Sequence, residues 1–145
     1  MAEAPAKDTL ALVVLSSAYE RVHYALATAA AAAAVDKPVV VFFTEGAVRT
    51  VAGTAERPGW HALTVADPSL GAGDAAGLDQ AFRARGAAGI EELLGACQEL
   101  GVALLVCSMG MRVAGIAKTE LRRDLPLHET GLTDVLSRAR LPTFV

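Results

Sequence analysis

The residue best suited to chemistry in this sequence is a cysteine at the end of an apolar run. Cys107 lies in the segment ALLVCSMGM at positions 103–111, where Gly110 allows a turn and a short helix is expected to begin near Met111. A thiolate near a helix N-terminus is stabilised by the helix dipole and by free backbone amides, and the thiolate is the reactive form of cysteine. Cys107 is therefore a candidate nucleophile. The alternative is a structural role, because free cysteine is among the most buried residue types.

Other small and polar residues follow the predicted strands, where the ligands of parallel α/β sheets gather. Glu45 is expected just beyond a strand end, where it could orient a partner or interact with a helix dipole. The two methionines beside the Cys107 turn could line an apolar pocket over the thiol or belong to the core. The candidate binding residues are Ser16, Ser17, Thr44, Glu45, Ser108, Met109, Gly110 and Met111.

The three histidines of the chain could act as a base or hydrogen-bond partner for a thiol. His23 and His128 are the candidates for such a supporting role, and the alternative for each is a partly exposed surface position. No pair of histidines or cysteines has the spacing of a metal site, so neither a metal nor a cofactor is expected. Cys97 falls on the apolar stripe of a predicted helix and is interpreted as core packing.

The elements that must position these residues alternate between strand and helix. Continuous apolar runs rich in Val and Leu predict strands buried on both faces, as in parallel sheets, near residues 9–15, 39–43, 102–107 and 141–145. Helices are expected at 16–35, 44–53, 90–100 and 129–140, with an extended piece at 125–128. Ser16 or Ser17 could cap the first helix, with Glu20 completing a capping box. The alternation predicts an α/β three-layer sandwich with a flavodoxin-like parallel sheet.

Residues 54–88 interrupt this alternation with three turn-prone patches. The short run WHALTV at 60–65 predicts a weak strand, and the rest predicts a mobile excursion, since connections of this length are usually functional or disordered. The segment GAGDAAG at 71–77 has the glycine spacing of a dinucleotide-binding loop, but it follows a Pro-Ser loop instead of a strand. It is interpreted as a flexible loop.

Length and composition exclude several classes of protein for this chain. A chain of 145 residues fits a single domain spanning 1–145, and a net charge of −3 argues against a general binder of nucleic acid or of an anionic membrane. The longest weakly polar run, at 25–35, is too short for the roughly 20 residues that cross a bilayer. Two cysteines do not make a disulfide framework, so a cytoplasmic location is expected. A mean hydropathy of +0.40 favours apolar surface covered in a homo-oligomer.

The block GIEELLGACQELGVALLVCSMGMRVAGI at 89–116 resembles the DsrE/DsrF-like family of small sulfur-metabolism proteins. The resemblance extends to LVVLSSAYERVHYALATAAAAAA at 12–34, VVVFFTEGAV at 39–48 and LPLHETGLTDVLSRA at 125–139, and residues 54–88 stay unmatched. It implies a homo-oligomer, commonly a trimer or hexamer. It also implies a strand-end cysteine that carries sulfur as a persulfide, and Cys107 stands at that position.

The leading hypothesis is therefore a sulfurtransferase-like sulfur carrier, in which the Cys107 thiolate accepts a sulfane sulfur from a donor protein or small molecule and passes it to an acceptor. Backbone amides at 108–110 would stabilise the anion. One alternative is a non-catalytic protein that binds a small ligand at the strand ends. Another is an oligomeric scaffold in which the cysteine only packs.

Overall fold

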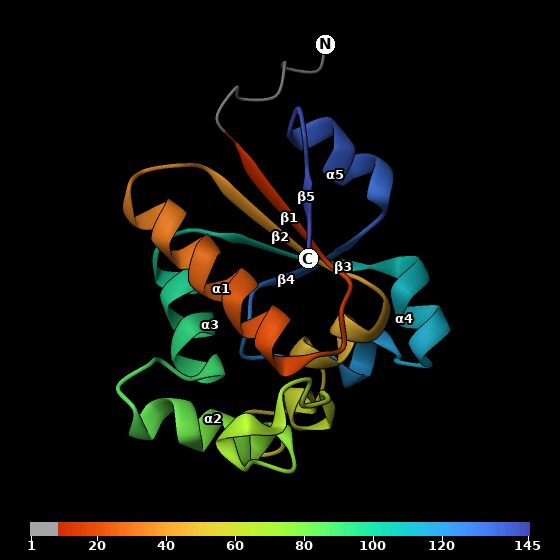
Figure 1. Cartoon of the computed structure of the whole chain (residues 1–145). Helices are drawn as coiled ribbons and strands as arrows, with labels where there is room; N and C mark the ends of the chain where they lie inside the picture. The colour runs from red at the N-terminus through yellow and green to blue at the C-terminus, as the bar shows by residue number, and fades with distance from the viewer. Residues whose placement is uncertain (1–8) are drawn as a thin grey trace.

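A single parallel sheet organises the chain. The structure is a computed structural model that describes residues 9–145, and all the strand pairs of its five-stranded sheet are parallel. The spatial order is β4-β3-β2-β1-β5 (Figure 1). The strands are β1 (Leu10–Val14), β2 (Val39–Phe43), β3 (Ala103–Cys107), β4 (Leu127–Thr130) and β5 (Thr143–Phe144). The predicted α/β sandwich with a flavodoxin-like parallel sheet is confirmed.

The central strands of the sheet are buried on both faces. β2 is buried at every position and lies between β1 and β3, with Val41 opposite Leu12 on one side and opposite Leu104 on the other. Since both faces of these central strands are covered, their sequences are continuously apolar. The predicted strand at 141–145 is shorter than expected, because β5 pairs with β1 over only two residues. The extended piece predicted at 125–128 overlaps β4, which runs from Leu127 to Thr130 and pairs Thr130 with Cys107. The helix predicted at 129–140 therefore begins later than expected, at Leu132.

Helices cover the two faces of the sheet unequally. α1 (Tyr19–Ala34) and α3 (Ile90–Glu99) lie side by side on one face, and α5 (Leu132–Arg138) lies on the other (Figure 1). The Ser17–Glu20 capping box predicted for α1 is wrong. Ala18 is the N-cap residue and makes no side-chain cap, while the Glu20 carboxylate instead accepts backbone N–H groups of Ala66 and Asp67.

The segment 54–88 is more structured than the sequence predicts. The weak strand expected at 60–65 is wrong, because residues Gly59–Ala62 form a 3₁₀ helix, η2. The loop expected from GAGDAAG is partly wrong, because Asp74 accepts a hydrogen bond from the Gly77 N–H and starts α2 (Ala75–Ala84). The segment also contains η3 (Pro68–Leu70). Outside it, the 3₁₀ helices are η1 (Glu45–Val51), where the sequence predicts a short helix, and η4 (Lys118–Glu120).

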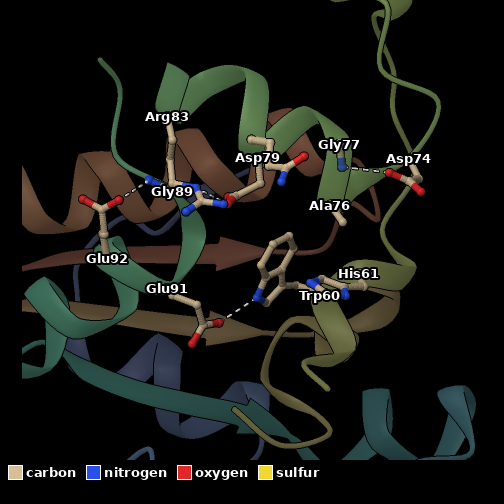
Figure 2. Close-up of a pocket in the computed structure, with 11 residues that line it drawn as sticks. Trp60, His61, Asp74, Ala76, Gly77, Asp79, Arg83, Gly89, Glu91 and Glu92 are labelled. Carbon is tan, nitrogen blue, oxygen red and sulfur yellow. Dashed lines mark hydrogen bonds and ion pairs between the residues drawn. The ribbon is translucent and has the colours of Figure 1, made fainter. Parts of the chain in front are cut away.

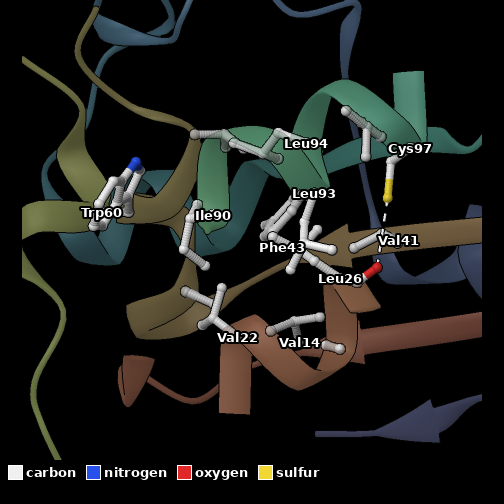
Figure 3. Close-up of a cluster of buried hydrophobic side chains, with 14 of the residues drawn as sticks. Val14, Val22, Leu26, Val41, Phe43, Trp60, Ile90, Leu93, Leu94 and Cys97 are labelled. Atoms are coloured by element: carbon white, nitrogen blue, oxygen red, sulfur yellow. Dashed lines mark hydrogen bonds between the residues drawn. The ribbon is translucent and has the colours of Figure 1, made fainter. Parts of the chain in front are cut away.

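Two separate apolar clusters hold the layers together. The larger one lies under α1 and α3 and includes Leu26, Phe43, Ile90 and Cys97 (Figure 3). The smaller one lies on the opposite face, where the buried residues are Ala11, Val13, Val40, Phe42, Leu105, Cys107, Val135 and Ala139. The two cysteines therefore belong to different faces of the sheet. Both are free thiols.

Candidate functional site

Cys107 ends β3 and is also the N-cap residue of α4 (Ser108–Ala114). Its Sγ accepts a hydrogen bond from the Gly110 N–H at 3.3 Å. The amide is thus directed at the atom that would carry negative charge in a thiolate, as the sequence predicts for one of the three amides at 108–110. The thiol is also buried, because only 2% of Cys107 is accessible to solvent.

The carboxyl ends of β1, β2 and β3 converge beside this turn. A Cβ built on Gly110 would lie 2.9 Å from the backbone nitrogen of Glu45 and 3.1 Å from Thr44 Oγ1, so α4 begins directly against the end of β2. A Cβ built on Gly46 would lie 2.8 Å from the Ser17 Cβ, which brings the loop after β1 to the same place. The structure thus brings together these predicted strand-end residues. Ser16 is part of the loop after β1, and its Oγ accepts the Ala18 N–H.

Glu45 and Ser108 lie near the turn that follows Cys107. Glu45 is exposed and has φ +47°, a left-handed conformation that is unfavourable for a residue with a side chain. The Ser108 hydroxyl donates to the Thr130 carbonyl oxygen at 3.3 Å and so ties the start of α4 to the end of β4. Neither side chain has a polar contact with the Cys107 sulfur among the described residues.

The methionines do not form the pocket expected over the thiol. Met109 is 51% exposed, and Met111 is buried in the larger cluster, on the face of the sheet opposite to the Cys107 side chain. The helical geometry of α4 explains the difference, since residues one and two positions apart point in different directions around a helix. Cys107 belongs instead to the smaller cluster, to which α5 contributes Val135 and the residue after the helix contributes Ala139.

Neither candidate histidine has a hydrogen bond with the Cys107 sulfur among the residues that the structure describes. The His23 ring is engaged elsewhere. Its Nε2 lies 2.8 Å from the Ala88 carbonyl oxygen, and its ring stacks on Tyr19 at 5.7 Å between centroids. His128 is exposed on β4, paired in register with Leu105, two residues before the partner of Cys107. The third histidine, His61, packs edge-on against Trp60 at 4.4 Å.

A polar cluster on β4 and α5 lies next to the Cys107 strand end. The Thr130 hydroxyl donates to Asp134 Oδ2 at 3.0 Å, and Arg138 NH2 pairs with the same oxygen at 3.0 Å. The Arg138 hydrogen bond is the main reason that the pKa of Asp134 lies below its ordinary value. Because Thr130 is the register partner of Cys107, this cluster borders the site. The sequence reasoning did not single it out.

Cys97 is buried like Cys107, but it lies in the other cluster and makes a different kind of hydrogen bond. It is fully buried on α3, and its thiol donates to the Leu26 carbonyl oxygen at 3.7 Å (Figure 3). Burial raises the pKa of this thiol to about 11, which keeps it protonated at neutral pH. The interpretation of Cys97 as core packing agrees with these surroundings.

A cavity of about 530 Å³ lies elsewhere, between η2, α2 and α3 (Figure 2). Trp60 and His61 form one wall, Asp79 and Arg83 of α2 form another, and the start of α3 closes the third side. The sequence reasoning missed this site because it treated residues 54–88 as a loop. The N-cap pattern of Asp74 before AAGLDQAFRA was the signal that could have revealed α2.

Buried hydrogen bonds fix the walls of this cavity. Asp79 Oδ1 accepts from the Tyr19 hydroxyl at 2.7 Å and from the Ile90 N–H at 2.8 Å. Burial, followed by the hydrogen bond to Asp79, raises the pKa of Tyr19. A second network behind the cavity joins Glu91 Oε2 to Trp60 Nε1 and to Arg122, each at 2.7 Å.

Neither site has the donor set of a metal centre. Among residues 9–145, no group of three or more His, Cys, Asp or Glu side chains is arranged to hold a metal ion. Within the same range, no helix is both long enough and apolar enough to span a membrane.

Comparison with known protein families shows to which family the chain belongs. The profile of the DsrE/DsrF-like family matches residues 9–139, from β1 through α5. The chain belongs to the DsrE/DsrF-like family. Membership suggests a role in sulfur metabolism, and the match includes the segment 54–88 that the sequence resemblance left out. A search of curated proteins found no significant match.

Proposed function

We propose that this DsrE/DsrF-like protein is a sulfur carrier, in a sulfurtransferase-like relay, that holds sulfane sulfur as a persulfide on Cys107. The observation that carries the proposal is the hydrogen bond from the Gly110 N–H to Cys107 Sγ, at the carboxyl end of a central parallel strand. An amide directed at sulfur stabilises both a thiolate and a persulfide anion. Among residues 9–145, Cys97 receives no such hydrogen bond, and burial raises its pKa, so it is less suited than Cys107 to this role at neutral pH.

The transfer is a thiol exchange between the protein and a donor persulfide. The Cys107 thiolate attacks the outer sulfur of R–S–SH, a new S–S bond forms, and the donor S–S bond breaks with its electron pair on R–S⁻. The proton that left Cys107 ends on the departing thiolate. The net change is Cys–SH plus R–S–SH to Cys–S–SH plus R–SH, with no external oxidant or reductant.

Intact mass after incubation with polysulfide tests the proposal. The wild-type chain and Cys97→Ser are expected to gain the mass of one sulfur atom, which a reducing thiol then removes. Cys107→Ser is expected to gain none. Uptake by Cys107→Ser equal to that of the wild type would reject Cys107 as the carrier.

The cavity beside α2 favours a second candidate, binding of a small organic cation. Its volume of about 530 Å³ is in the usual range for ligand pockets. Four carboxylates and one arginine line it, namely Asp74, Asp79, Glu91, Glu92 and Arg83. This location differs from the strand ends, where the sequence placed a small ligand. The carboxylates stand apart around the cavity (Figure 2), which suits an amine better than a metal ion.

A thermal-shift comparison tests this candidate. Putrescine is expected to raise the unfolding temperature of the wild-type chain, and butanediol, which lacks charge, is not. Glu92→Gln in the cavity should weaken the effect, while Glu99→Gln on the same helix outside the cavity should preserve it. Equal shifts for both variants would reject the cavity as the binding site.

We also propose that the chain forms a homo-oligomer, as a trimer or hexamer, in the cytoplasm. Exposed apolar side chains support association, since Tyr24 of α1 is 73% exposed and Val35, directly after α1, is 68% exposed beside an apolar groove. The two free cysteines support a reducing compartment. Sedimentation at micromolar concentration tests the assembly, and a monomer of 15.0 kDa would contradict it.

A further inference from the structure

The burial of Cys107 raises the question of how a donor reaches it. On the face of the sheet where its side chain lies, the buried residues that come from outside the strands are Val135 of α5 and Ala139, the residue after α5. α5 follows β4, whose last residue Thr130 pairs with Cys107. Attack on a persulfide requires the sulfur to contact its partner directly, so this cover must move before the reaction.

Few buried side chains hold α5 against the sheet. Within the helix, Val135 is the single buried residue, and Leu132 and Leu136 are 42% and 49% exposed. No side chain caps its N-terminus, and Gly131 before it has open space around its Cα. Elements with few buried contacts open at a lower free energy than the whole protein.

The polar contacts of α5 also leave it free to move as a unit. Its side-chain hydrogen bonds and ion pair, among the described residues, all lie within positions 130–138. Asp134 and Arg138 pair within the helix, and the Thr130 contact is four residues away in sequence. Lifting α5 from the sheet therefore breaks apolar contacts but no long-range polar contact of its side chains.

We propose that α5 is a movable cover of Cys107, which opens locally and exposes the thiol while the rest of the fold stays intact. The proposal rests on the proposed function for its biological meaning, since opening would admit the sulfur donor. The opening itself is a property of the fold and is measured without sulfur transfer.

Iodoacetamide labelling of the full chain under native conditions, read separately at each cysteine by peptide mass, tests this cover. Val135→Ala removes the buried contact and is expected to label at Cys107 about tenfold faster, the change for a loss of about 1.4 kcal/mol. Leu136→Ala is the matched control, since that side chain is half exposed on the same helix, and should change the rate less than twofold.

A variant in the other cluster separates local from global opening. Ile90→Val weakens the packing under α1 and α3 but leaves α5 untouched. It should accelerate labelling of Cys97 and leave the rate at Cys107 unchanged. Acceleration of both cysteines in step would show that Cys107 is exposed only by global unfolding, and it would overturn the proposal. An unchanged Cys107 rate in Val135→Ala would overturn it as well.

The wild-type chain provides the same test if a variant fails to fold. The labelling rate of Cys107 should rise less steeply with urea than that of Cys97, because local opening exposes less surface than unfolding. Equal slopes would contradict the cover. If Cys107 labels through local opening but takes up no sulfur from polysulfide, the cover stands and the proposed function falls.

Discussion

Gly110 offers a quantitative test of the geometry around Cys107. Its missing side chain lets the first turn of α4 lie against the end of β2, and an added Cβ would meet Glu45 N at 2.9 Å and Val48 Cγ2 at 3.0 Å. The backbone nitrogen cannot rotate away as a side chain can. Overpacking of this kind costs about 1–3 kcal/mol. Replacing glycine by alanine inside a helix returns about 1 kcal/mol, so Gly110→Ala should lose up to about 2 kcal/mol of unfolding free energy.

Gly95 is the matched control because it is also inside a helix, α3, and has open space around its Cα. Gly95→Ala is expected to stabilise the chain by about 0.5–1 kcal/mol. In urea unfolding, the same substitution should therefore destabilise the chain at position 110 and stabilise it at position 95. Iodoacetamide labelling of Gly110→Ala should also show a changed labelling rate at Cys107. Two variants that stabilise equally would refute the close approach of α4 to β2.

Two further predictions concern stability. The Arg122 side chain is 2% exposed and forms ion pairs with Glu91 at 2.7 Å and with Asp124 at 2.6 Å. Arg122→Ala should therefore lower the free energy of unfolding in urea by about 1–3 kcal/mol. The control Arg123→Ala, at an exposed neighbouring position, should change it by no more than about 0.5 kcal/mol. Equal losses would contradict the network. Burial raises the pKa of Cys97 to about 11, above the value of about 8.5 in the unfolded chain. The contribution of the protonated Cys97 thiol to folding stability is therefore complete below about pH 8.5 and is lost as the pH rises toward 11. Cys97→Ala should therefore flatten the alkaline decline in unfolding free energy, and an unchanged decline would refute the raised pKa.

Most of the sheet follows from local sequence. The apolar runs at β1, β2 and β3 specify strands buried on both faces, and their burial in the structure matches that pattern. β5 is too short for such a pattern to define, because it pairs over only two residues. The α1 cap was misread because Glu20 bonds to Ala66 and Asp67, and a contact across 46 residues has no local signature.

The site was harder to predict than the fold. Position at a strand end identified Cys107 and the neighbouring turn, but the direction of each side chain depends on pleat and helix phase. That is why Met111 lies on the face opposite to Cys107. The cover by α5 and the cavity beside Trp60 arise from segments that meet only in the folded chain. His23 illustrates the same limit, since its partner is the carbonyl of Ala88.

Release of sulfur from the loaded protein tests the central claim most directly. Cys97→Ser, loaded with polysulfide and freed of excess reagent, is mixed with cyanide, which removes the outer sulfur of a persulfide as thiocyanate and leaves the cysteine thiolate. We predict one thiocyanate for each loaded chain and return of the original mass, with none from Cys107→Ser treated in the same way. Absence of thiocyanate from Cys97→Ser, or an equal yield from Cys107→Ser, would contradict a transferable sulfur on Cys107.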